Sequence, residues 1–274
     1  MEKKSLNLKG KTVAYLEAGN ADDVPVLFLH GVPETSLIWK EILPAIAANG
    51  FRTIAPDLPG FGNSDCFDEI STWDRYEQFI SEFTEMLGLE QLHLVVHDWG
   101  GLIGLSWTCE NLDRVLSLII SDTTISDEYK WHKLAQIWRT PGAGEQLMKQ
   151  IADWDAFRTG MQPAVPFADT ATLWDFFQVF RTPESSSVVL QLYRSATMAK
   201  VTQYKGKLSS FKQPVSIIWG ESDSYIPVEF AFKLKKESLP QADIHLIKNA
   251  GHFIHLEQPD KVKSLLSQHL DAFK

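Results

Sequence analysis

Cysteine is scarce in this chain, which has only Cys66 and Cys109 among its 274 residues. Two thiols cannot form the framework of cross-links that stabilises small secreted domains, so we expect both to be buried and reduced in a cytoplasmic protein. The first residues, MEKKSLNLKGKTVAYLEAG, have a basic start but no apolar stretch after it, which predicts no signal peptide. No run of about 18 apolar residues occurs either, so we expect no segment that spans a membrane.

Positive charge is also in short supply. The 26 Lys and Arg residues are outnumbered by 35 Asp and Glu residues, which leaves a net charge of −9. A chain of this sign repels phosphate backbones and anionic lipids, so we predict neither a nucleic acid nor a membrane as a partner. The sequence has no Cys–His cluster typical of zinc sites, and Gly60-Phe61-Gly62 lacks the third glycine of a phosphate-binding loop. We therefore expect no metal and no cofactor.

What the sequence does contain is an alternation of short apolar runs with helical patterns. Polar and apolar residues alternate around Lys9-Gly10, which predicts an N-terminal hairpin. The apolar runs are Val26–Leu29, Thr53–Ala55, Leu92–Val96, Val115–Ile120, Val215–Trp219 and Ile244–Ile247, and the helical patterns are Leu37–Ala48, Trp73–Leu87 and Gly101–Glu110. This order predicts an α/β fold whose central sheet is mostly parallel and flanked by helices. Ligands bind such sheets at the carboxyl ends of the strands.

The alternation stops between about residues 126 and 212. This stretch has no apolar run typical of a buried strand, is rich in Trp and Phe, and carries helical patterns separated by prolines. We interpret it as a helical cap inserted over the carboxyl edge of the sheet. The predicted domains are therefore a core of residues 1–125 and 213–274 and a cap of residues 126–212. Most of the cap aromatics are expected to fill its own small core, and a few to face a cavity.

A candidate nucleophile lies where one of the strands turns into a helix. The segment LVVHDWGG at residues 94–101 has the form of a nucleophile elbow, a sharp turn that needs small neighbours such as Gly100, Gly101 and Gly104. The residue at its tip is Asp98, where the usual G-x-S-x-G pattern has serine. A lone Asp here is also a common helix N-cap, so the assignment depends on two further motifs.

These motifs supply an oxyanion hole and a base. In LFLHGVP, at residues 27–33, the tight loop after a strand offers the backbone N–H of Val32, which together with that of Trp99 can hold developing negative charge. In NAGHF, after the last strand, His252 takes the position of the general base. Asp223 follows another strand and is the predicted acid that orients His252. Asp122, which also follows a strand, is the alternative acid.

These motifs resemble those of the α/β-hydrolase superfamily from about Val26 to Glu257. Within it, HDWGG at 97–101 is similar to the haloalkane dehalogenases and the epoxide hydrolases, which share an aspartate nucleophile. APDLPGFGNSD at 55–65 and WRTPGAGEQLM at 138–148 resemble the dehalogenases, and AGHFIHLEQPD at 250–260 fits both families. The resemblance implies a fold of the α/β-hydrolase type with an Asp98–His252–Asp223 triad.

The two families differ in how they assist the leaving group. Resemblance to the dehalogenases implies that Trp99 and a cap aromatic, for which Trp154 is the candidate, contact the halide. Val32 departs from this pattern, because dehalogenases often carry Asn or Glu there. Epoxide hydrolases use two cap tyrosines, of which only Tyr193 has a match. The fluoroacetate dehalogenases place arginines after the nucleophile, where this chain has Leu102 and Ile103.

The leading hypothesis is cleavage of a carbon–halogen bond through a covalent alkyl-aspartyl ester that a His-activated water hydrolyses. Epoxide hydrolysis by the same nucleophile is the alternative, and a ligand-binding member of the fold without catalysis is the third hypothesis. The expected partners are a small apolar halogenated or epoxide substrate, water and the halide product. We expect a monomer or a weak homo-oligomer.

Overall fold

The computed structural model describes residues 1–273 and has one eight-stranded sheet with the order β1-β2-β4-β3-β5-β6-β7-β8. β1 and β2 form an antiparallel hairpin, β2 is antiparallel to β4, and all other neighbours are parallel. The predicted α/β architecture is thus confirmed. The strands are β1 (Glu2–Leu8), β2 (Lys11–Ala18), β3 (Pro25–Leu29), β4 (Arg52–Pro56), β5 (Leu92–His97), β6 (Val115–Ser121), β7 (Val215–Gly220) and β8 (Asp243–Ile247).

The hairpin turn forms where the sequence predicts it. Lys9 and Gly10 both have positive φ angles, 52° and 87°, and the Asn7 side chain accepts a hydrogen bond from the Gly10 N–H at 2.9 Å. This side-chain acceptor stabilises the tight turn, across which Leu8 pairs directly with Lys11.

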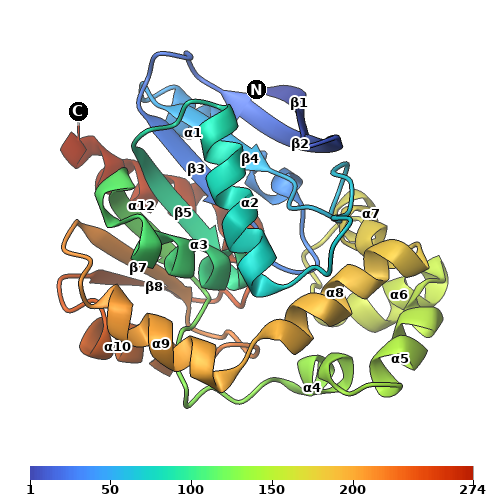
Figure 1. The fold of residues 1–274 in the computed structure, drawn as a ribbon. Helices are drawn as coiled ribbons and strands as arrows, with labels where there is room; N and C mark the ends of the chain where they lie inside the picture. Colours follow the sequence, from blue (N-terminus) through green and yellow to red (C-terminus); the bar gives the residue numbers. More distant parts are fainter. Residues whose placement is uncertain (274) are drawn as a thin grey trace.

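Helices cover both the sheet and its carboxyl edge. They are α1 (Leu43–Ala47), α2 (Trp73–Met86), α3 (Asp98–Glu110), α4 (Lys133–Arg139), α5 (Ala143–Ile151), α6 (Trp154–Met161), α7 (Thr170–Phe177), α8 (Pro183–Ser195), α9 (Met198–Leu208), α10 (Glu229–Glu237), α11 (Ile254–Glu257) and α12 (Pro259–Leu270). Four short 3-10 helices complete the structure: η1 (Ser36–Trp39), η2 (Leu112–Arg114), η3 (Gln178–Phe180) and η4 (Asp271–Phe273). In Figure 1, α2 and α3 lie in front of the sheet, whereas α4 to α8 gather at the lower right, beyond the sheet. No described helix is long and apolar enough to cross a membrane.

The helix predicted over Leu37–Ala48 is wrong as a continuous element. The structure has η1 (Ser36–Trp39) and then a separate α1 (Leu43–Ala47) with Pro44 in its first turn. Proline has no N–H for the bond back to the preceding turn, so a helix can begin at Pro44 but cannot run through it.

The segment between β6 and β7 is helical, as expected for the cap. All of its residues are described, and they form α4 to α9 and η3 with no strand among them. Threonine or aspartate side chains cap several of these helices. Thr182, for example, accepts a hydrogen bond from the Ser185 N–H at 3.1 Å, and Pro183 follows at the first helical position.

Candidate active site

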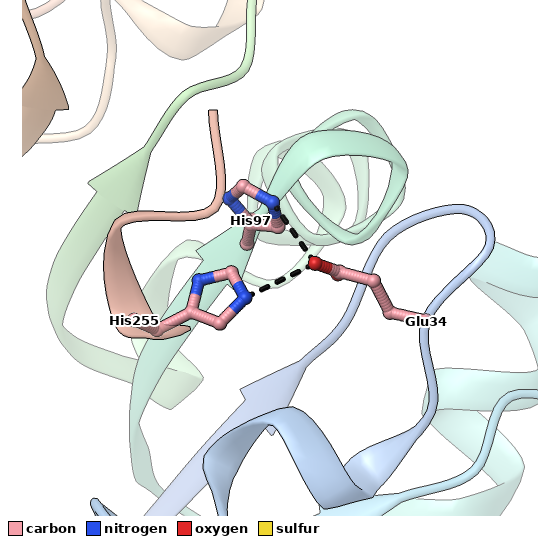
Figure 2. A group of neighbouring side chains, drawn as sticks. All are labelled: Glu34, His97 and His255. Carbon is pink, nitrogen blue, oxygen red and sulfur yellow. Dashed lines mark hydrogen bonds and ion pairs between the residues drawn. The ribbon is translucent and has the colours of Figure 1, made fainter. Parts of the chain in front are cut away.

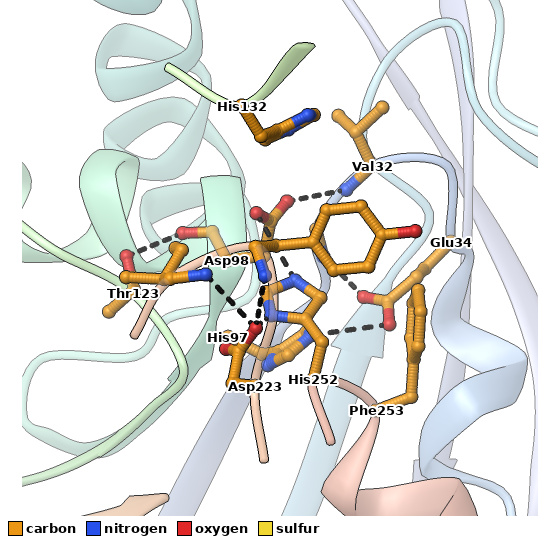
Figure 3. A network of polar contacts seen from close by, with 12 residues as sticks. Val32, Glu34, His97, Asp98, Thr123, His132, Asp223, His252 and Phe253 are labelled. Carbon is orange, nitrogen blue, oxygen red and sulfur yellow. Dashed lines mark hydrogen bonds and ion pairs between the residues drawn. The ribbon is translucent and has the colours of Figure 1, made fainter. Parts of the chain in front are cut away.

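The chain segments that directly follow β3, β5, β6, β7 and β8 meet at one edge of the sheet. They carry Val32, Asp98 (the first residue of α3), Asp122, Asp223 and His252 respectively. Because parallel strands all end at this edge, residues far apart in the sequence come together there. Figure 3 shows most of this group, with Asp98 between Val32 and His252.

Asp98 occupies a strained turn between β5 and α3. Its φ angle is 48°, in the left-handed region that costs a residue with a side chain about 1–2 kcal/mol. The turn is possible because the following residues are small. A Cβ on Gly100 would lie 2.5 Å from the carbonyl oxygens of Leu29 and His30, and one on Gly101 would lie 2.3 Å from the Thr123 hydroxyl oxygen. The structure therefore has the elbow geometry that the glycines predict.

The Asp98 carboxylate is held from two sides. The Val32 N–H donates to its Oδ1 at 2.9 Å, and Nε2 of His252 lies 3.5 Å from its Oδ2. Burial alone would raise the pKa of Asp98, but His252 and the Val32 N–H outweigh burial and lower it below its usual value. Asp98 is therefore ionised at neutral pH, and its side chain, 14% exposed, faces the cavity described below.

His252 is oriented by Asp223. Its Nδ1 lies 2.8 Å from Oδ2 of Asp223, whose Oδ1 accepts the N–H groups of Tyr225 and Ile226. Burial would lower the pKa of His252, but the carboxylates of Asp223 and Asp98 raise it well above its usual value. The charged form of the imidazole is therefore favoured while Asp98 is ionised.

Asp122, the alternative acid, also lies close by. One carboxylate oxygen of Asp122, one of Asp223 and one ring nitrogen of His252 lie within 4.8 Å of one another. Oδ1 of Asp122 accepts the Gly220 N–H at 3.0 Å, while its Oδ2 is buried without a hydrogen-bond partner in the described chain. Burial and the nearby charge of Asp223 raise the pKa of Asp122 well above its usual value, which favours the neutral form of its carboxyl group.

A cavity of about 240 Å³ opens above Asp98 and His252. Among the described residues that line it, none is Lys, Arg or Glu, and Asp98 is the one Asp. Its wall includes Val32, Pro33, Trp99, Leu102, Tyr129, Trp131, His132, Leu134, Trp138, Leu147, Ile151, Phe157, Phe180, Tyr193, Tyr225 and Phe253. The site therefore combines one carboxylate and two imidazoles, those of His132 and His252, with a mostly apolar, aromatic chamber.

Trp99 lines this cavity. Trp154 is absent from the described residues of the cavity wall. The Trp99 ring stacks on Trp131 at 5.9 Å and meets Tyr193 edge-on at 5.0 Å. Trp154 instead packs against Trp174 and neighbouring phenylalanines, at the first position of α6. The hypothesis that Trp154 contacts a halide has no support from this position, because the residues of α6 that line the cavity are Phe157, Gly160 and Met161.

Several residues that line the site escaped the sequence-based prediction. Tyr225, two residues after Asp223, lies with its ring 5.1 Å from that of His252. Trp138 lines the cavity with its Nε1 buried and without a hydrogen-bond partner in residues 1–273. The one signal for Trp138 was the aromatic content of the cap, which does not say which side chains turn inward. Tyr225 lies outside the cap and had no such signal.

Two groups of described residues have the composition of a metal site. Glu34, His97 and His255 form one, and Asp122, Asp223 and His252 form the other; in each, the possible ligand atoms lie within 4.8 Å of one another. In the second group Nδ1 of His252 is engaged by Asp223. In the first, Glu34 is surrounded by N–H donors (Figure 2).

Comparison with known proteins places these features among hydrolases. The family model described as alpha/beta hydrolase fold matches residues 24–259. A haloalkane dehalogenase of Psychrobacter cryohalolentis is 29% identical over 93% of this chain and 86% of its own length. A proline iminopeptidase of Lactobacillus delbrueckii subsp. bulgaricus is 28% identical over 91% of this chain and 90% of its own.

Solved structures show the same fold. A haloalkane dehalogenase of Bradyrhizobium elkani is similar with a TM-score of 0.87 and 24% identity, covering 99% of this chain and 98% of that one. An epoxide hydrolase of Vigna radiata is similar with a TM-score of 0.81 and 19% identity over 99% and 98% of the two chains. At these identities the likeness concerns the fold alone.

Proposed function

The chain belongs to the alpha/beta hydrolase fold family, and from this membership and the site geometry we propose that it is a haloalkane dehalogenase. The observation that carries the proposal is an ionised carboxylate, Asp98, at the elbow tip beneath an uncharged aromatic cavity, with a histidine 3.5 Å away. A serine at the tip would suit ester or amide cleavage, whereas a carboxylate can displace a leaving group from saturated carbon.

The first step forms the covalent intermediate. An oxygen of Asp98 attacks the carbon that bears the halogen, the carbon–halogen bond breaks, and the halide leaves with the bonding electrons. The product is a neutral alkyl ester of Asp98. The Trp99 indole N–H is the proposed donor to the departing halide, since indole can only donate.

Tyr193 is the proposed second donor, because Val32 has no polar side chain. Burial raises the pKa of Tyr193 well above its usual value, against a smaller opposing effect of its hydrogen bond with the Trp99 side chain. Its hydroxyl therefore keeps its proton at neutral pH, and it lies 3% exposed in the cavity wall.

The second step hydrolyses the ester. His252 takes a proton from water, the hydroxide adds to the ester carbonyl, and the negative charge on its oxygen is stabilised by the N–H groups of Val32 and Trp99. Collapse breaks the bond between the carbonyl carbon and the alkyl oxygen, and the alkoxide takes the proton from His252 and leaves as the alcohol. The Asp98 carboxyl group keeps the other proton of the water and releases it to solvent, which restores the carboxylate. Alkylation itself prepares this step, because it removes one of the two negative charges that raise the pKa of His252, and the imidazole then releases its proton to solvent and can act as the base.

The cavity also limits the substrate. A wall without Lys, Arg or Glu in the described chain offers no counter-charge to a carboxylate or an ammonium group. We propose small to medium uncharged haloalkanes, enclosed by a cap domain of residues 126–212 on a core of residues 1–125 and 213–274.

Epoxide hydrolysis is the second candidate, because the Tyr193 hydroxyl can also donate a proton to an epoxide oxygen. A halide-release and pH-drop assay on short bromoalkanes, run beside styrene oxide opening, separates the two. We expect halide release without epoxide opening. Epoxide opening without halide release would reverse the assignment.

A further inference from the structure

A second polar cluster lies behind the active site. Figure 2 shows Glu34, on the loop after β3, between His97 at the end of β5 and His255 in α11. Glu34 and His97 are 0% exposed and His255 is 1% exposed. The described residues that line the cavity include none of these three. The cluster is therefore separated from the cavity, and it can act on the site only through the neighbouring segments that it holds in place.

Both oxygens of Glu34 face N–H groups. Oε2 accepts the Gly31 N–H at 2.7 Å, and Oε1 lies 3.0 Å from Nε2 of His255 and 3.3 Å from Nε2 of His97. The distance from Nε2 of His97 to Oε1 of Glu34 is that of an ion pair, but the two groups are not aligned for a hydrogen bond. Burial would raise the pKa of Glu34, but the two imidazoles hold it well below its usual range. A buried carboxylate is costly without such donors, so these contacts fix the position of Glu34 firmly.

Each partner of Glu34 adjoins one part of the active site. Gly31 precedes Val32 and lies so close to the nucleophile that a Cβ there would be 2.4 Å from the Asp98 Cβ. His97 precedes Asp98, and its ring lies 4.8 Å from that of His252. His255 lies three residues after His252. One carboxylate thus joins the oxyanion loop, the elbow and the segment that carries the base.

We propose that Glu34 is a positioning residue that, through Gly31, His97 and His255, holds the Val32 N–H and His252 in register with Asp98. This inference depends on the proposed function, because it concerns the second step of that reaction. Displacement of halide needs the ionised Asp98 carboxylate and little from Val32. Hydrolysis needs the Val32 N–H at the ester oxygen and His252 at the attacking water.

Loss of the Glu34 charge should therefore slow hydrolysis more than alkylation. The test is rapid-quench kinetics with 1-bromobutane on Glu34→Gln, following the alkylated enzyme by intact mass. We expect hydrolysis to slow by about tenfold or more, alkylation by less than about threefold, and alkyl-enzyme to accumulate. Glu17→Gln is the matched control, because Glu17 is also buried and ion-paired, with Arg52 at the opposite end of the sheet.

The control variants separate the possible failures. Equal slowing of both steps, or a change in thermal stability alone as in Glu17→Gln, would overturn the positioning role. If His252→Gln forms no adduct either, the proposed function fails instead. If Glu34→Gln does not fold, the test compares His255→Gln with His255→Leu. The Gln variant keeps an N–H near Glu34 and should hydrolyse the ester normally, whereas the Leu variant should accumulate the alkyl-enzyme. Failure of all three to fold would assign the cluster to stability and not to positioning.

Discussion

At the scale of single residues, the chemistry depends on protonation states that burial and neighbouring charges impose. Asp98, which is half-buried, and Asp122, which is fully buried, both have left-handed backbones at the ends of adjacent strands. The His252 imidazole and the Val32 N–H lower the pKa of Asp98 and favour its ionised form, whereas burial and the charge of Asp223 raise the pKa of Asp122 and favour its neutral form. The same residue type is therefore suited to be the proposed nucleophile in one place and favours its neutral form in the other.

This difference predicts unequal effects of two conservative substitutions. Asp122→Asn puts a neutral amide where the neutral form of the carboxyl group is favoured, so it should change the hydrolytic rate by less than about threefold. Asp223→Asn removes the charge that orients His252 and should slow hydrolysis by about a hundredfold or more. Single-turnover kinetics of ester hydrolysis measure both. A larger loss in Asp122→Asn than in Asp223→Asn would make Asp122 the triad acid.

Trp99 provides a test of the proposed halide site. Trp99→Phe keeps an aromatic ring but removes the indole N–H, so halide displacement should slow by about tenfold or more. Styrene oxide opening, if any is detected, should change much less. Trp107→Phe is the control, because the Trp107 N–H donates to Ser81 at 2.9 Å and Trp107 is not among the described cavity residues. Equal effects on the two substrates would remove Trp99 from the halide site.

At the scale of elements, the elbow depends on how closely α3 approaches β3. The Leu29 and His30 carbonyl oxygens that a Cβ on Gly100 would meet belong to the backbone and cannot rotate away. Gly100→Ala should therefore lower the free energy of unfolding by about 1–3 kcal/mol and impair activity. Urea denaturation and halide release measure the two effects.

Gly206→Ala is the matched control. Gly206 lies within α9, and a Cβ there would meet nothing within 4 Å. Because alanine favours a helix interior over glycine, this change should raise the free energy of unfolding by up to about 1 kcal/mol. If Gly100→Ala were as stable and active as Gly206→Ala, the close approach would not be essential.

How well the sequence predicts an element depends on how local its cause is. Strand ends and the elbow are encoded in short motifs, so Asp98, Val32 and His252 could be placed from a few neighbouring residues. The rotation of a cap helix depends on its packing partners, which is why Phe157 faces the cavity and Trp154 does not. The Glu34–His255 contact joins residues 221 positions apart and has no local signal.

At the scale of the whole molecule, a titratable residue is also buried at the other edge of the sheet. His93, at the start of β5, is 0% exposed, and burial lowers its pKa to about 4. Its Nδ1 lies 2.7 Å from the Ser117 hydroxyl, and its ring packs on Phe273 at 4.6 Å. This residue therefore couples stability to pH without any part in the proposed reaction.

The sign of that coupling follows from the two states. His93 stays neutral in the folded chain down to about pH 4 and binds a proton below about pH 6.5 when unfolded, so its contribution falls as pH decreases through this window. The stability advantage of the wild type over His93→Gln should shrink by about 1.4 kcal/mol per pH unit there. Urea unfolding at pH 7 and pH 5 measures it, with His245→Gln as control; an advantage independent of pH would contradict the buried neutral state.

The central claim for the molecule is that Asp98 becomes covalently alkylated and that His252 is needed only to release the product. The most direct test is the intact mass of His252→Gln after incubation with 1-bromobutane, followed by peptide mapping. We predict that one butyl group is added, that it maps to Asp98, and that Asp98→Asn shows no such addition. An unmodified His252→Gln, or an adduct on another residue, would contradict the mechanism.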